Sequence, residues 1–133
     1  MKKEIYINLA VRNLEKSKAF FKALGFTFNE QFSNEKGACM VIAEGSIHVM
    51  LLDEEFFRTF TQKTVINAHE QVETLITLGC ESEKEVDEMV AKAVAAGGKA
   101  PRPPEDYGFM YTDGFEDLDG HNWGVGYMRG NPG

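Results

Sequence analysis

Residues 5–26, which read IYINLAVRNLEKSKAFFKALGF, join a strand pattern to a helix pattern. Apolar residues alternate over 5–11, which predicts a half-buried strand. Asn13 is a residue type that caps helices, and from Leu14 to Leu24 apolar residues recur at helical spacing. Gly25 is typical of the position that follows a helix. The stretch therefore predicts a strand followed directly by a helix.

The chain that follows predicts three short strands, and Gly37 and the pair Glu44-Gly45 provide turns between them. A short amphipathic helix is then expected over 53–60, with three phenylalanines on one side, and residues 61–71 are polar and loop-like. The expected strands cover residues 26–33, 38–43 and 47–52.

The same order of elements starts again in the second half. Ser82 and Glu85 form a capping-box pattern at the start of a helix expected over 83–96. Three prolines at 101, 103 and 104 predict a stiff connector after it. Strands are expected at 72–80, 109–116 and 122–128, with a turn at 117–120 before the last.

The repeated order of strand, helix and strands predicts two related modules, at approximately 1–60 and 72–130. A shift of 69 residues places Leu9 on Leu78, although the side chains of the two halves are otherwise unlike. Each half is small for an independent domain, so we expect one domain over 1–133. The predicted fold class is α+β.

Two segments at opposite ends of the chain resemble one known family. Residues 8–17, with Phe20-Phe21 and residues 24–26, resemble the opening of the vicinal oxygen chelate superfamily, which includes glyoxalase I, bleomycin-resistance proteins and extradiol dioxygenases. Residues 115–123, FEDLDGHNW, resemble its closing motif. The resemblance implies two βαβββ modules that form an open, curved mixed-sheet barrel around a cavity, and many relatives are homodimers.

The resemblance also implies a divalent metal, held by His, Glu or Gln, that acts as a Lewis acid on two vicinal oxygens of a substrate. The family's ligand positions fall here on Tyr6, Met50, Leu75 and Gly124. These side chains are not ligands that such metals prefer. We therefore expect no metal and no other cofactor.

Strand alternation predicts the residues that line the cavity. They are largely apolar and aromatic with a few polar groups, which is typical of a small-molecule pocket. Glycines at 124 and 126 leave one face of the last strand without side chains, either for a ligand or for a large neighbour such as Tyr6. The expected lining is Tyr6, Asn8, His48, Met50, Leu52, Leu75, Thr77, Tyr107, Phe109, Tyr111, Asn122, Gly124 and Gly126.

Other candidate groups favour structural roles. His48 faces this lining, but a packed imidazole with its hydrogen bonds satisfied is expected there. His69 lacks the second histidine of a HExxH site, and His121 is a turn residue. The acidic residues at 113–119 lack the spacing of a calcium loop and predict a solvated hairpin. Cys39 and Cys80 are far apart and predict two reduced thiols.

The amino-acid composition limits the kinds of partner that we expect the protein to bind. The 133 residues include 14 Lys and Arg against 21 Asp and Glu, a net charge of -7 that disfavours nucleic acid and anionic membranes. No apolar run is long enough to span a bilayer, and the N-terminus lacks a signal-peptide pattern, so a cytoplasmic protein is expected.

Three functions remain open. The first is a metal-free protein that binds a small, partly apolar molecule, and the second is a metal-dependent glyoxalase-like lyase or dioxygenase. The third is a structural or regulatory module without a ligand. No nucleophile–base pair or carboxylate pair decides whether the protein is an enzyme. A homodimer is expected, because Phe56, Phe57 and Phe60 form a large aromatic surface on a short helix.

Overall fold

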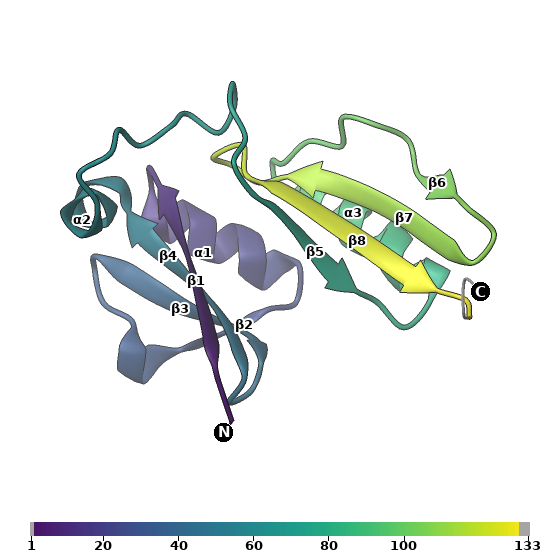
Figure 1. Ribbon diagram of the computed structural model, residues 1–133, viewed down its shortest axis with the longest axis horizontal. Helices are drawn as coiled ribbons and strands as arrows, with labels where there is room; N and C mark the ends of the chain where they lie inside the picture. The colour runs from purple at the N-terminus through teal and green to yellow at the C-terminus, as the bar shows by residue number, and fades with distance from the viewer. Residues whose placement is uncertain (1, 131–133) are drawn as a thin grey trace. The chain divides into compact units, whose positions relative to one another are not determined.

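The computed structural model describes residues 2–130, and the chain divides into two compact units, residues 1–65 (unit 1) and 66–133 (unit 2). Each unit carries a four-stranded mixed sheet with one long helix on one of its faces (Figure 1). Both follow the order strand, helix and three strands, so the fold is α+β with two βαβββ modules.

Unit 1 has the strand order β1-β4-β3-β2, in which β1 runs parallel to β4 and the other pairs are antiparallel. The Asn13 side chain accepts a hydrogen bond from the Lys16 N–H at 3.0 Å, as the capping pattern predicts. The strands and helices are β1 (Ile5–Val11), α1 (Leu14–Ala23), β2 (Thr27–Asn29), β3 (Gly37–Ala43), β4 (Ile47–Asp53) and α2 (Glu54–Phe57).

The core of unit 1 lies between its sheet and α1, which packs on β3 and β4. Alternate residues of the central strands turn to this side, and Phe20 and Phe21 of α1 meet edge to face at 5.0 Å between ring centroids. The buried set includes Leu9, Val11, Phe20, Phe21, Met40, Val49 and Leu51. We call the opposite side of this sheet, away from α1, open face 1.

Two elements of unit 1 are shorter than the sequence pattern predicts. The strand expected at 26–33 ends at Asn29, whose side chain accepts from the Gln31 N–H and starts a 3-10 turn over Glu30–Phe32. The helix expected over 53–60 is α2 followed by a 3-10 turn at Arg58–Phe60. In both places a local side-chain or 3-10 hydrogen bond competes with the longer element.

Unit 2 has the strand order β5-β8-β7-β6, again with one parallel pair, β5 with β8. Its elements are β5 (Leu75–Gly79), α3 (Glu83–Ala95), β6 (Glu105–Asp106), β7 (Met110–Glu116) and β8 (Asn122–Met128). Ser82 accepts from the Glu85 N–H at 3.0 Å, as the capping box predicts, but the Glu85 carboxylate accepts from Glu81 N at 2.8 Å. The short strand β6 falls within the proline-rich region where no strand was expected.

The core of unit 2 lies between α3 and the sheet, because α3 packs on β7 and β8 and lies behind them in Figure 1. Trp123 is 1% exposed and stacks with Phe115 at 6.2 Å between ring centroids. Val86, Val90 and Val125 complete this core. The sheet side away from α3 is open face 2.

The turn before β8 is organised by a buried carboxylate. Asp117 is 5% exposed and accepts hydrogen bonds from the backbone N–H groups of Asp119 and His121 and from the Trp123 indole, each at 3.0 Å. Burial raises its pKa, and nearby His121 opposes that shift. The expectation of a solvated hairpin is therefore wrong at Asp117, which joins the turn to the core tryptophan.

Candidate functional site

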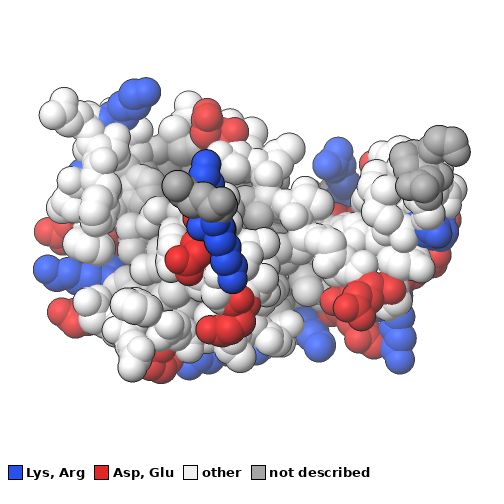
Figure 2. All heavy atoms as spheres, turned by 60° about the horizontal axis from the view of Figure 1, so that its bottom comes forward, with Lys and Arg blue, Asp and Glu red and all other residues white. Residues whose placement is uncertain are grey.

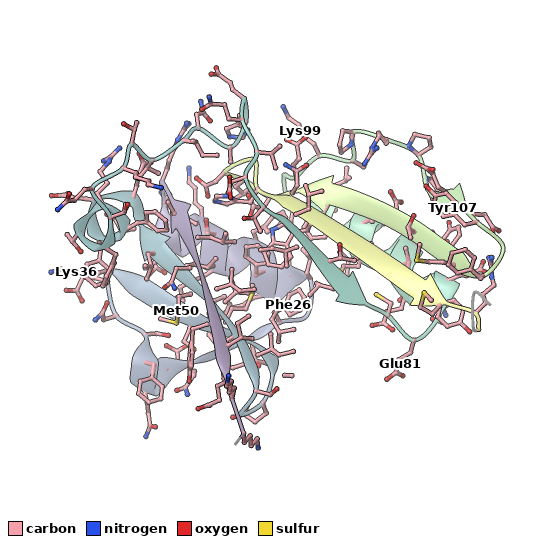
Figure 3. All side chains as sticks on the ribbon, viewed as in Figure 1. Phe26, Lys36, Met50, Glu81, Lys99 and Tyr107 are labelled. Atoms are coloured by element: carbon pink, nitrogen blue, oxygen red, sulfur yellow. The ribbon has the colours of Figure 1, made fainter. Side chains whose placement is uncertain are left out.

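Open face 1 brings together the residues that alternation assigns to the lining in the first half. In the parallel register Tyr6 lies beside His48, Asn8 beside Met50, and Ala10 beside Leu52. Their neighbours in sequence, such as Leu9 and Leu51, turn to the α1 side. Met50 can be followed on β4 in Figure 3.

His48 is the most unusual group on this face. Its imidazole is only 5% exposed and stacks under the Tyr6 ring, with centroids 4.6 Å apart and planes 10° from parallel. Its Nδ1 atom is buried and has no hydrogen-bond partner among the described residues. A buried polar atom without a partner costs about 1–3 kcal/mol. The imidazole is therefore packed as expected, but its hydrogen bonding is not satisfied.

Open face 2 carries Leu75 and Thr77 from β5 and three residues from β8. Leu75 pairs with Asn122, Thr77 with Gly124, and Gly79 with Gly126. Trp123 and Val125 turn to the opposite side, into the core. Leu75 is 70% exposed, so this face has an apolar side chain open to solvent.

Three aromatic residues expected in the lining occupy other places. Tyr111 shares the helix side of β7 with Phe115, and its hydroxyl donates to the Asp87 carboxylate of α3 at 2.7 Å. This hydrogen bond raises the pKa of Tyr111 to about 12. Tyr107 and Phe109 lie in the turn between β6 and β7. The large apolar Phe115 is the signal that would have placed Tyr111, four residues earlier, on the helix side.

A cavity of about 200 Å³ lies on open face 2, under the connector between α3 and β6. It contains four of the expected residues, Leu75, Thr77, Asn122 and Gly124. Sequence reasoning missed Arg102 of the connector, Glu105 of β6, and Thr112 and Gly114 of β7. The alternation of Thr112 and Gly114 with Phe115 is the signal for the last two.

The glycine at 124 lies at a close approach to the Thr77 side chain. A Cβ built there would lie 2.9 Å from Thr77 Oγ1, closer than side-chain carbons are found. Thr77, from the neighbouring strand, therefore occupies the space that the missing side chain leaves. A large residue such as Tyr6 is not needed to explain this glycine.

We expect Gly124→Ala to lower the free energy of unfolding by about 1–3 kcal/mol, the usual cost of overpacking. The control is Gly126→Ala on the same strand, where the nearest atom, Thr112 Cγ2, is 3.5 Å from the new Cβ. Gly126→Ala should be neutral or stabilising, because glycine weakens a strand interior. Urea denaturation measures both.

Thr77→Ala in combination with Gly124→Ala should recover most of that loss, because it removes the crowding atom. Additive effects of the two substitutions in a double-mutant cycle would contradict the proposed clash.

The residue types at the ligand positions that the resemblance implies do not fit a divalent metal. These positions hold Tyr6 and Met50 in unit 1 and Leu75 and Gly124 in unit 2, which provide one phenol, one thioether and no carboxylate or imidazole. Thr77, in its present rotamer, also blocks a longer side chain at position 124. Within each unit, over residues 2–130, no group of three or more His, Cys, Asp or Glu side chains is arranged to hold a metal ion.

Both cysteines are free thiols, and neither has the low pKa of a nucleophile. Cys39 is buried, which raises its pKa. Burial and then the Glu85 carboxylate, which Cys80 contacts by a hydrogen bond, raise the pKa of Cys80 to about 11.

We expect Cys80 to react with iodoacetamide at pH 8 about a hundredfold more slowly than an unperturbed thiol, because its thiolate is scarce. Its rate should rise steeply with pH up to about 11. Glu85→Gln should accelerate the reaction, whereas Glu88→Gln, on the same helix, should not. Peptide mass spectrometry follows the rate, and a half-maximal rate near pH 8–9 would contradict the expected pKa.

Comparison with known protein families shows to which family the chain belongs. Residues 5–125 match the family model of the Glyoxalase/Bleomycin resistance protein/Dioxygenase superfamily. The chain belongs to this superfamily. The resemblance drawn from the two terminal motifs is thus confirmed. Among residues 2–130, no helix is long and apolar enough to cross a membrane.

Solved structures share the fold over nearly the whole chain. The hypothetical protein SA1046 from S. aureus is 34% identical, covers 96% of this chain and 95% of its own, and superposes with a TM-score of 0.82. Protein ATC0852 from Agrobacterium tumefaciens is 25% identical, covers 98% of this chain and 100% of its own, and superposes with a TM-score of 0.74.

A glyoxalase-related enzyme from Fulvimarina pelagi shares the fold at 20% identity, with a TM-score of 0.81 over 99% of this chain and 90% of its own. A search of curated proteins gave no match.

Proposed function

We propose that the protein binds a small, partly apolar molecule without a metal, in the cavity on open face 2. The observation that carries this proposal is the cavity itself, about 200 Å³ in volume, with exposed Leu75 beside polar Thr77 and Asn122. Apolar surface with a few polar groups is the usual composition of a ligand site. The volume lies below the roughly 300–1,000 Å³ of drug-sized sites, so the ligand is small.

Mass spectrometry of small molecules released from the native protein tests this proposal. We expect a compound bound in stoichiometric amount to the wild type and lost from Thr112→Phe, which fills the cavity. Thr27→Phe, an exposed strand substitution in unit 1, is the control and should retain the compound. Equal recovery from all three proteins would contradict binding at this site.

The alternative is a metal-dependent glyoxalase-like lyase or dioxygenase. Superfamily membership supports it, but the donor set described above does not, and we derive no catalytic step through a metal. Nickel, zinc, manganese and iron(II), added separately, test the alternative by metal binding and by turnover of the methylglyoxal–glutathione adduct. Tight stoichiometric binding, with activity lost on chelation, would replace the metal-free proposal.

We also propose that two copies of the chain associate. Phe60 is 69% exposed, and its ring meets Phe56 edge to face at 5.1 Å between centroids, so an aromatic surface remains uncovered. A second copy of the chain could cover this surface. The surface charge supports a protein partner over nucleic acid, because acidic and basic side chains are interspersed on the face that Figure 2 shows. Light scattering that finds a monomer at micromolar concentration would contradict the dimer.

A further inference from the structure

The connector before β6 creates the cavity by standing away from β7. Lys99 pairs with Glu116, and Glu105 pairs with Thr112, so the connector advances six positions where β7 advances four. The two extra residues must bow outward. Prolines at 101, 103 and 104 lack the N–H group that strand pairing needs, which keeps this segment off the edge of β7. Lys99 and Tyr107 are labelled on either side of the segment in Figure 3.

The bowed segment brings an arginine without an ion pair to the cavity. Arg102 lines it and forms no ion pair with the described residues. Arg129, the other arginine described in unit 2, is fully engaged, because it binds Glu83, Asp106 and the Gly108 carbonyl and lies over the Tyr111 ring. Arg102 is thus the arginine of unit 2 whose donors remain available.

Two hydroxyl groups add to these donors. Thr77 and Thr112 both line the cavity, and neither hydroxyl has a hydrogen bond to the described residues. The Asn122 amide makes only a long contact, 3.5 Å, to the Gly120 carbonyl. A guanidinium, two hydroxyls and an amide favour a ligand rich in acceptor oxygens.

The two carboxylates beside the cavity each accept a hydrogen bond from a group other than Arg102. Glu105 accepts from the Tyr107 hydroxyl. Asp113 accepts from the Gly114 N–H at 2.7 Å, and its pairing with Val125 places it on the α3 side of the sheet. Neither carboxylate forms an ion pair with Arg102, so the donors of its guanidinium remain available to a ligand.

We infer that the cavity binds a small organic anion, whose carboxylate or phosphate lies against Arg102 and whose apolar part lies on Leu75. This inference rests on the proposed function and specifies its ligand class. The planar guanidinium binds such oxyanions through two parallel hydrogen bonds. Pro101 and Pro103 offer further apolar surface at the rim.

Titration of the 15N-labelled protein with benzoate, phenyl phosphate and the neutral analogue benzamide tests the inference. Benzoate or phenyl phosphate should shift the amide signals of Gly114 and Gly124 at roughly millimolar concentration, and benzamide should not. The stronger of the two anions identifies a carboxylate or a phosphate ligand. Arg102→Gln should weaken binding about tenfold, the loss expected for a charge-assisted pair, and Arg102→Lys should weaken it less.

Arg58→Gln is the matched control, because it removes an arginine from unit 1 that already pairs with Glu54. It should leave the titrations unchanged, and the amide spectrum of each variant verifies its fold. Benzamide shifts equal to those of benzoate and insensitive to Arg102→Gln would overturn the anion assignment while leaving the proposed function intact. If no probe shifts the amide signal of either glycine, the inference is overturned. The proposed function is tested separately, by mass spectrometry of the compound released from the native protein.

Discussion

Trp123→Ala should lower the free energy of unfolding by about 3–5 kcal/mol, as large aromatic truncations in cores do. The ring is 1% exposed and stacks with Phe115 in the core under α3. Its indole N–H is also one of three donors to the buried Asp117 carboxylate. The substitution therefore opens a cavity and leaves a buried carboxylate with one donor fewer.

Trp123→Phe separates these two effects, because it retains most of the ring and removes the N–H. We expect it to cost about 1–3 kcal/mol, the range for an unpaired buried acceptor. Met128→Ala, at a half-exposed position of the same strand, should change stability little. Urea denaturation measures all three, and an unchanged midpoint for Trp123→Ala would show that the ring is not part of the core.

Gly120→Ala should lower the free energy of unfolding by about 2–5 kcal/mol, from two causes that act together. Gly120 has φ +87°, where a side chain costs roughly 1–2 kcal/mol. A Cβ there would also lie 2.6 Å from the His69 backbone nitrogen and 2.8 Å from the Ala68 carbonyl carbon. Backbone atoms cannot rotate away, so this overpacking adds about 1–3 kcal/mol.

Gly108→Ala is the matched control that separates the overpacking at Gly120 from the cost of the positive φ. Gly108 has φ +84° in the same unit, but a Cβ there meets nothing within 4 Å. It should show the conformational cost alone, roughly 1–2 kcal/mol. Equal losses for the two variants in thermal or urea unfolding would mean that segment 68–69 moves aside without cost.

The long elements were predictable because each has its own local signals. Asn13 and Ser82 cap α1 and α3 as their side-chain types predict. The last strand was predicted with its observed bounds, since its turn and its alternation agree. Strand β6 was missed because prolines mark its neighbourhood as a connector, and two backbone pairs are enough to form it.

The candidate site was harder to predict, because its features depend on register and on space between strands. Alternation identified Thr77 and Gly124 as residues of one face, but it cannot show that one side chain fills the place of the other. Arg102 has no periodic pattern around it, since it lies in an irregular segment. Tyr111 was assigned to the wrong face because its alternation with Phe115 was not applied, although its hydrogen bond with Asp87, 24 positions away, is visible only in the structure.

The two extra residues of the connector have an evolutionary consequence. Surface loops tolerate insertions and deletions better than the sheets they border. Removal of two residues between Lys99 and Glu105 would match the length of this segment to that of β7 and reduce the bow, and an insertion would enlarge the space beneath it. The volume beneath the connector can therefore diverge by small length changes, while the tryptophan core and the glycine strand stay the same.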